Sequence, residues 1–334
     1  MTRYIIIGAG AVGASLAAQF EGAGIAYALV GRGAQIDHIR EHGLEYRRPS
    51  GTRQVRLNAF TADAPPALAG NDVLLLAVKA QDVDVATTHW AARTIDGVGT
   101  TAGFALPIVT FQNGLAAESI ALRRFARVYG ASIMTPARFS EIGKVVAAGD
   151  PEVGAIVLGA YPGGEDDVGR RIALDLANAG YLAEVRSDIK RWKASKLAYN
   201  VKNVLELFGG TTDEHAAFGE ALEREARQVL DTAGYTFAQP VERRISIAHW
   251  GVAEDAGIVP GQQSTWQSYV RGTSSEVEFL NGEIVLLGRL HGIATPFNEA
   301  VQEAAARLAN TSGKPGMVPL SSVRALVDTL ASAA

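Results

Sequence analysis

The stretch Tyr4-Ile5-Ile6-Ile7-Gly8-Ala9-Gly10-Ala11-Val12-Gly13 decides how this chain folds. Its uninterrupted apolar start is typical of a parallel strand that is buried on both faces. The strand ends on G-x-G-x-x-G, and a segment of helical character, Ala14 to Phe20, follows at once. In such a turn Gly8 permits the tight bend, Gly10 lets the backbone approach a pyrophosphate, and Gly13 lets helix and strand pack closely. The pattern predicts a dinucleotide-binding unit; the alternative is a glycine-rich turn with a purely structural use.

Composition limits what can be built on this turn. The 334 residues, 48% hydrophobic and 20% charged, suffice for two domains with sizeable cores. A formal net charge of -4 gives no basic field for nucleic acid. No apolar run approaches the ~20 residues of a membrane span, and the first strand begins too early to leave room for a signal peptide. We therefore expect a cytoplasmic protein with a small-molecule substrate and neither nucleic acid nor membrane as a partner.

Cysteine is absent from the sequence. This excludes disulfides, thiolate metal sites and cysteine nucleophiles, and no metal site is expected.

Two basic residues stand where parallel strands end. The second strand, Ile25 to Val30, is followed by Arg32, and another buried strand, Asn71 to Val78, is followed by Lys79. An acidic residue at the end of the second strand favours NAD, whereas an arginine accommodates the 2′-phosphate of NADP. Arg32 therefore favours NADP(H), and Lys79 is expected beside the cofactor phosphates or the substrate. The alternatives are a solvated loop arginine and a surface lysine.

Asn113 follows the next strand, Pro107 to Phe111, within Gln112-Asn113-Gly114. An asparagine at this edge of the sheet can bind a substrate carboxylate or hydroxyl, or the nicotinamide amide. Because Asn-Gly is also a common turn pair, the spacing alone leaves both interpretations open.

Near residue 187 the apolar spacing becomes mostly helical, so we expect domains at 1–186 and 187–334. A helix is predicted from Ser187 to Leu205. With ~100° of turn per residue, Asn200 lies about 40° round from Lys196, Asn203 about 20° on the other side, and Val204 about 80° away. This is a polar stripe on one face, either functional or merely solvated.

The ordered motifs resemble those of the ketopantoate reductase family over essentially the whole chain. The matching pieces are Gly8 to Gly13, Val30-Gly31-Arg32, Val78-Lys79-Ala80, Gln112-Asn113-Gly114, Lys196-Leu197-Ala198-Tyr199-Asn200, Ser264, Glu276 to Gly282, and Gly292 to Pro296. Ordered agreement across two domains is more specific than any single motif.

The resemblance implies a Rossmann domain followed by an all-helical domain of the 6-phosphogluconate dehydrogenase C-terminal type. It implies NADPH-dependent reduction of 2-dehydropantoate (ketopantoate), a step of pantothenate biosynthesis, or of a close analogue. Lys196 would be the general acid, and Glu276 would orient it and accept a substrate hydroxyl. The remaining expected site residues bind substrate (Asn113, Asn200, Asn203, Ser264) or cofactor (Gly8, Ala9, Gly10, Ala11, Val12, Gly13, Arg32, Lys79, Asn113).

Two departures bear on the substrate. Val204 stands where the family has a second asparagine, and the family's Ser-Ser-Met-x-Gln-Asp segment lacks its aspartate here, with Ser268 in that place. A valine cannot pair the 4-hydroxyl of ketopantoate, so this substrate is expected to be reduced poorly, while Asn203 could present an amide from a shifted position.

Two other functions stay open. One is an enzyme on the same scaffold that acts on another 2-oxo acid, 2-hydroxy acid or alcohol. The other is a non-catalytic NADP-binding sensor. The oligomeric state is not readable from the sequence, although a homodimer through the helical domain would be unsurprising.

Overall fold

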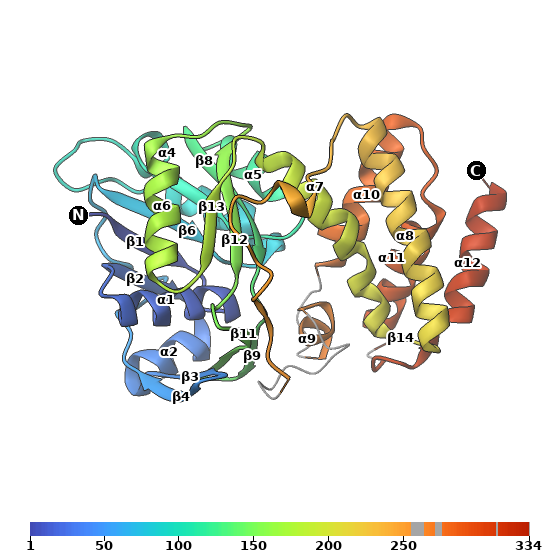
Figure 1. Cartoon of the computed structure of the whole chain (residues 1–334), viewed down its shortest axis with the longest axis horizontal. Coiled ribbons are helices and arrows are strands. Elements are labelled where there is room, and N and C mark those ends of the chain that lie inside the picture. Colours follow the sequence, from blue (N-terminus) through green and yellow to red (C-terminus); the bar gives the residue numbers. More distant parts are fainter. Residues whose placement is uncertain (255–263, 271–275, 312, 334) are drawn as a thin grey trace. The chain divides into compact units, whose positions relative to one another are not determined.

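The computed structural model describes residues 1–254, 264–270, 276–311 and 313–333. The chain divides into two compact units (Figure 1). The predicted division lies between residues 186 and 187, whereas the structure divides the chain after Lys190 and also exchanges two short segments between the units. The first unit contains Met1–Gln112, Ala117–Lys190 and Pro240–Ile258, and the second contains Asn113–Ala116, Arg191–Gln239 and Val259–Ala334.

In the described residues, the first unit is built on a sheet of eight strands in the order β13-β12-β8-β7-β6-β1-β2-β5. Neighbouring strands are parallel except β8 and β12, which are antiparallel. β1 lies between β2 and β6, so that Ile7 pairs with Val30 on one side and Leu76 on the other. The strands span Arg3–Ile7 (β1), Tyr27–Gly31 (β2), Ala59–Thr61 (β5), Asp72–Leu76 (β6), Pro107–Thr110 (β7), Arg127–Met134 (β8), Ala155–Tyr161 (β12) and Leu182–Val185 (β13).

Helices cover both faces of this sheet. Tyr4 and Ile6 share one core with helices α1 (Ala11–Ala23), α2 (Gly33–His42) and α6 (Asp167–Asn178). Ile5 and Ile7 share the core on the opposite face with helices α3 (Val83–Ala91), α4 (Ala102–Ala105) and α5 (Ala116–Leu122). Because alternate residues of β1 enter different cores, the strand is an unbroken buried run from Tyr4 to Ile7 after its first residue, Arg3. The predicted doubly covered parallel sheet is confirmed.

A smaller sheet in the first unit has the order β4-β3-β10-β9. Its β3–β4 hairpin (Leu44–Arg48 and Gly51–Val55) pairs through β3 with β10 (Lys144–Ala147), which pairs with β9 (Ala137–Glu141). A further two-stranded pairing joins β11 (Gly149–Asp150) to β15 (Gly251–Val252). This pairing explains why a late segment of the chain returns to the first unit.

The second unit is helical around one apolar core, to which Leu197, Leu222, Ile284 and Val301 contribute. Its longest helix, α8, begins with a capping box between Thr211 and Glu214. The elements are α7 (Ile189–Asn200), the 3-10 helix η2 (Val201–Leu207), β14 (Phe208–Gly209), α8 (Thr212–Thr232), α9 (Ser264–Val270), α10 (Val277–His291), α11 (Pro296–Asn310), β16 (Val318–Pro319) and α12 (Leu320–Ala333). The expected helical domain is thus present.

One predicted helix is wrong in detail. Instead of one α-helix reaching Leu205, α7 ends at Asn200 and the chain continues as η2. At the change, the Asn281 side-chain amide donates a hydrogen bond of 2.9 Å to the Val201 carbonyl. Three residues per turn after Asn200 keep Asn203 aligned with Asn200 and carry Val204 to about 160° from Lys196.

Candidate active site

The glycine turn has the geometry that a dinucleotide requires. Gly8 has φ +113°, and a Cβ there would lie 2.8 Å from the Ala77 backbone. A Cβ at Gly13 would lie 1.9 Å from the Gly8 carbonyl oxygen, so helix α1 can approach the turn only if this residue is glycine. Among the described residues, by contrast, no atom lies within 4 Å of the position of a Cβ at Gly10. The backbone is therefore open at the point where a pyrophosphate approaches.

The N-terminus of α1 is suited to an anion. Gly10 precedes this helix and has no side chain with which to cap it, and the first turn carries no acidic residue. The positive end of the helix and its free N–H groups then favour negative charge. Ala9, Ala11 and Val12 complete this turn, and the residues present fit the phosphates of a dinucleotide.

Arg32 follows β2 and Lys79 follows β6, so both stand at the same edge of the sheet as the glycine turn. The Arg32 side chain is 74% exposed, and its Nη2 lies 2.7 Å from Oδ1 of Asp82 in the short helix η1 (Ala80–Asp82). Lys79 is half-buried and directly precedes η1. Sequence analysis did not single out Asp82, although an acidic residue so soon after a strand end was a visible signal.

Gln112 holds the exit of β6 in place. Its buried Nε2 donates to the carbonyls of Leu76 (2.9 Å) and Val78 (2.8 Å). These bonds fix the backbone that leads to Lys79. Sequence analysis noted Gln112 only as the neighbour of Asn113, because a side chain that braces a neighbouring strand leaves no periodic pattern.

Asn113 begins the short segment that groups with the second unit. Gly114, at φ +84°, would place a Cβ 2.4 Å from the Phe279 carbonyl, so the loop lies directly against the first turn of α10. The Asn113 Oδ1 atom is buried and has no hydrogen-bond partner among the described residues. Buried acceptors in proteins are normally hydrogen-bonded, and a ligand hydroxyl or amide N–H would provide the donor here.

Three of the predicted substrate-side residues follow one another along α7 and η2. Lys196 is half-buried, and Asn200 and Asn203 are 6% and 8% exposed. Because Asn203 lies one 3-10 turn after Asn200, the two amides are on the same side of the segment. A purely solvated stripe is excluded for these two amides by their burial.

The predicted placement of Val204 at a ligand-facing surface is wrong, whereas poor reduction of ketopantoate stays a prediction that has lost its stated reason. Its side chain is 1% exposed and belongs to the apolar core of the second unit. The change from α to 3-10 geometry turns this position inward. The argument that valine deprives a substrate hydroxyl of its partner therefore no longer applies.

Glu276 is 7% exposed and directly precedes α10. Asn281 of α10 connects this helix to η2 and to α11, because its Nδ2 donates to the Val201 carbonyl and to Oδ1 of Asn298 (3.0 Å). The matching stretch Glu276 to Gly282 contains Asn281 but assigns it no role. Ser264 begins α9, and its side chain lies outside the described residues.

The predicted residues thus form two sets, one in each unit. The first contains Gly8 to Gly13, Arg32 and Lys79, and the second contains Asn113, Lys196, Asn200, Asn203, Ser264 and Glu276.

Within the described ranges, no helix is long and apolar enough to cross a membrane, and no cluster of three or more His, Asp or Glu side chains could hold a metal ion.

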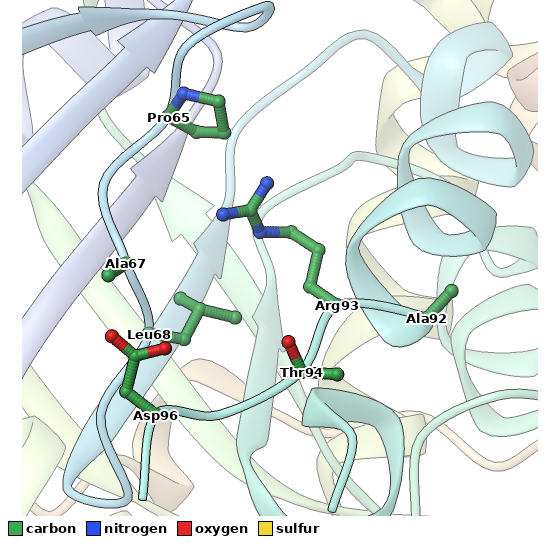
Figure 2. A pocket seen from close by; sticks show the side chains of 7 residues that line it. All are labelled: Pro65, Ala67, Leu68, Ala92, Arg93, Thr94 and Asp96. Atoms are coloured by element: carbon green, nitrogen blue, oxygen red, sulfur yellow. The ribbon is translucent and has the colours of Figure 1, made fainter.

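A separate pocket lies at the other edge of the sheet (Figure 2). It is lined by the loop that precedes β6 and by the segment after α3, whereas the glycine turn and Lys79 follow their strands. Arg93 points across it, donates to the Pro66 carbonyl at 3.1 Å and stacks on Trp90. Burial lowers the pKa of this guanidinium. The pocket is not part of the dinucleotide site.

The sheet unit and its open glycine turn define a dinucleotide-binding protein of the Rossmann class. Comparison with known families narrows the class: the model for "Ketopantoate reductase PanE/ApbA" matches residues 4–163, and that for its C-terminal part matches residues 188–309. The chain belongs to the ketopantoate reductase family.

Individual relatives agree with this assignment. The chain is 28% identical over 307 residues to a 2-dehydropantoate 2-reductase of Archaeoglobus fulgidus, with 90% of this chain and 95% of the relative covered. A PanE/ApbA family ketopantoate reductase from Ralstonia eutropha is 23% identical with a TM-score of 0.72, covering 98% and 99% of the two chains. A D-mandelate dehydrogenase solved with NADH and anilino(oxo)acetate reaches a TM-score of 0.73 at 18% identity, with the same coverage. The similarity to the last two proteins, the ketopantoate reductase from Ralstonia eutropha and the D-mandelate dehydrogenase, is a similarity of fold.

Proposed function

We propose that this protein catalyses the NADPH-dependent reduction of a 2-oxo acid to a 2-hydroxy acid, with ketopantoate as the first candidate substrate. The observation that carries the proposal is the pairing of two family matches with two sets of fitting residues, an open glycine turn in one unit and a lysine with buried amides and a carboxylate in the other. A sensor would have no need of the second set.

In the proposed reaction the ketone carbon gains a hydride and the ketone oxygen gains a proton. When bound, NADPH would supply this hydride and become NADP⁺. Lys196 donates the proton from its Nζ ammonium to the oxygen as alkoxide charge develops, which is the step that needs a positioned cationic donor. Glu276 orients Lys196 and accepts a hydrogen bond from a substrate hydroxyl. Asn113, Asn200, Asn203 and Ser264 hold the carboxylate and oxygens of the substrate.

The cofactor assignment rests on the strand ends. A nicotinamide dinucleotide agrees with the Gly10 opening and the uncapped α1 terminus. Arg32 supports NADP in particular, because a guanidinium binds phosphate bidentately through strong charge-assisted hydrogen bonds. Lys79 adds a second positive charge at the same edge of the sheet.

The family membership favours ketopantoate, and the core position of Val204 removes the reason that this residue gave to exclude it. The second departure, Ser268, stays untested because its side chain lies outside the described residues. Other 2-oxo acids remain the second candidates, because the 2-hydroxy acid dehydrogenase among the structural neighbours has the same fold.

A substrate panel tests the proposal. Purified protein is mixed with NADPH and each of ketopantoate, 2-oxo acids without the 4-hydroxyl, and simple ketones, and the loss of NADPH absorbance is followed; 2-hydroxy acids with NADP⁺ test the reverse reaction. We expect ketopantoate to give the highest kcat/KM. Binding of NADPH without turnover of any compound would contradict the enzymatic proposal and favour the sensor.

A further inference from the structure

The ion pair between Arg32 and Asp82 lies across the dinucleotide end of the sheet. Arg32 directly follows β2, and Asp82 is the last residue of η1, which comes after β6 in the chain. In the sheet, β1 with its glycine turn lies between β2 and β6. The Nη2–Oδ1 distance is 2.7 Å, with the aspartate side chain 35% exposed. A carboxylate is therefore in contact with the arginine that the proposed function assigns to the 2′-phosphate.

Neither stability nor helix capping accounts for this carboxylate. Exposed ion pairs contribute little to folding. Asp82 also occupies the N-cap position of α3, where aspartate is a preferred residue, but its side chain makes no capping hydrogen bond there. The Asp82 carboxylate accepts a hydrogen bond from Arg32 instead.

We propose that Asp82 helps to determine which nucleotide binds. It reduces the factor by which the protein prefers NADPH over NADH. This inference rests on the proposed function, in which Arg32 receives the 2′-phosphate. A phosphate monoester carries a charge of about -1.5 to -2 at neutral pH, so it meets repulsion from a carboxylate bound to the same guanidinium. NADH has a neutral 2′-hydroxyl at this place, which can donate a hydrogen bond to that carboxylate. Asp82 therefore weakens the binding of one nucleotide and tolerates the other.

The test compares dissociation constants for NADPH and NADH, measured by nucleotide fluorescence, in the parent and in Asp82→Asn. Removing one negative charge a few ångströms from the phosphate should tighten NADPH binding by roughly fivefold or more. NADH binding should stay the same or weaken, so the ratio of the two constants rises by at least that factor. Asp82→Ser provides a second variant, and thermal unfolding of each protein checks that it is folded.

Asp84→Asn is the matched control. This aspartate lies two residues further on, is 63% exposed and pairs with Arg124 at 2.8 Å, so its removal changes the net charge equally without touching Arg32. If Asp82→Asn and Asp82→Ser shift the NADPH-to-NADH ratio no more than Asp84→Asn does, the inference is overturned.

Arg32→Ala separates this inference from the function beneath it. If that variant keeps the parent's preference for NADPH, the NADP assignment fails and Asp82 loses its role with it. If Arg32→Ala loses the preference while the Asp82 variants leave the ratio unchanged, only the inference about Asp82 fails.

Discussion

At the scale of single residues, burial assigns different roles to side chains that are neighbours in sequence. Asn203 and Val204 are adjacent, and both are nearly inaccessible to solvent. Val204 belongs to an apolar cluster, whereas Asn203 lies on the same side of its segment as Asn200. Which of the two enters the apolar core follows from one change of helix type after Asn200.

Val204→Asn tests this reassignment. An amide placed among apolar side chains without a partner should lower the free energy of unfolding by roughly 1 to 3 kcal/mol. It should not raise kcat/KM for ketopantoate, because the new amide points into the core. Denaturant unfolding and steady-state kinetics give both results.

Val85→Asn is the control for this substitution, because that valine is 68% exposed on α3. A Val204→Asn protein as stable as the control, with improved turnover of ketopantoate, would show that position 204 faces the substrate after all.

At the scale of elements, the second unit depends on buried polar contacts between helices. Asn281 is fully buried in α10 and satisfies the Val201 carbonyl at the point where α7 becomes η2. Asn298, also fully buried, receives its second bond and in turn donates to Glu225 of α8 at 2.8 Å. This chain of contacts joins the segment with Asn200 and Asn203 to the helix that follows Glu276.

Asn281→Leu should therefore affect both stability and catalysis. Two buried acceptors lose their donor, at a cost of roughly 2 kcal/mol or more in unfolding free energy. We expect kcat to fall more than KM changes, since the polar segment loses its fixed position. Asn310→Leu, at an exposed site on α11, is the matched control. Equal stability and equal kcat in the two variants would refute the positioning role of Asn281.

Glu225 makes a pH-dependent contribution to stability. Burial raises the pKa of its carboxyl above the ordinary 4.5, against the opposing effect of hydrogen bonds from Asn298 and Phe297 at the start of α11. A raised pKa in the folded state means stability that is present below about pH 4.5 and is lost as pH rises through the folded pKa. The Tm of the parent minus the Tm of Glu225→Gln should therefore fall as pH rises above about 4.5 through the folded pKa.

Glu223, two residues earlier on α8, provides a control of opposite sign. Burial raises the pKa of this carboxyl, but hydrogen bonds from Lys202 and Arg227 outweigh it and leave the pKa below 4.5. Its contribution is present above that value and is lost as pH falls through the folded pKa. Parallel trends for Glu225→Gln and Glu223→Gln would contradict the pKa shift given for Glu225.

Sequence patterns predicted most elements because each pattern had one physical cause. The apolar run that ends at Gly8 predicted a strand buried on both faces. In the structure, alternate residues of this strand pack into two different cores. The helical apolar spacing after residue 187 likewise predicted a helical domain, which the structure confirms. The break after Asn200 was not predictable from the local sequence, since the contact made at this point comes from Asn281, far along the chain.

At the scale of the whole molecule, each unit carries one part of the proposed chemistry. The sheet unit offers an open turn and basic strand ends to a nucleotide, and the helical unit offers a lysine, amides and a carboxylate to a 2-oxo acid. The resemblance named these residues from motifs alone. What it could not supply were the brace at Gln112, the carboxylate of Asp82 and the core position of Val204, since each arises from contacts between distant segments.

The most direct measurement is the rate of ketopantoate reduction with NADPH, in the parent and in Lys196→Ala. If Lys196 protonates the developing alkoxide, the parent should turn over with a kcat/KM of ~10⁴ M⁻¹s⁻¹ or above, and the variant should lose a factor of roughly 10² to 10⁴ in kcat while it binds NADPH nearly as before. An unchanged kcat in Lys196→Ala, or a parent that binds NADPH but reduces neither ketopantoate nor any related 2-oxo acid, would contradict the account.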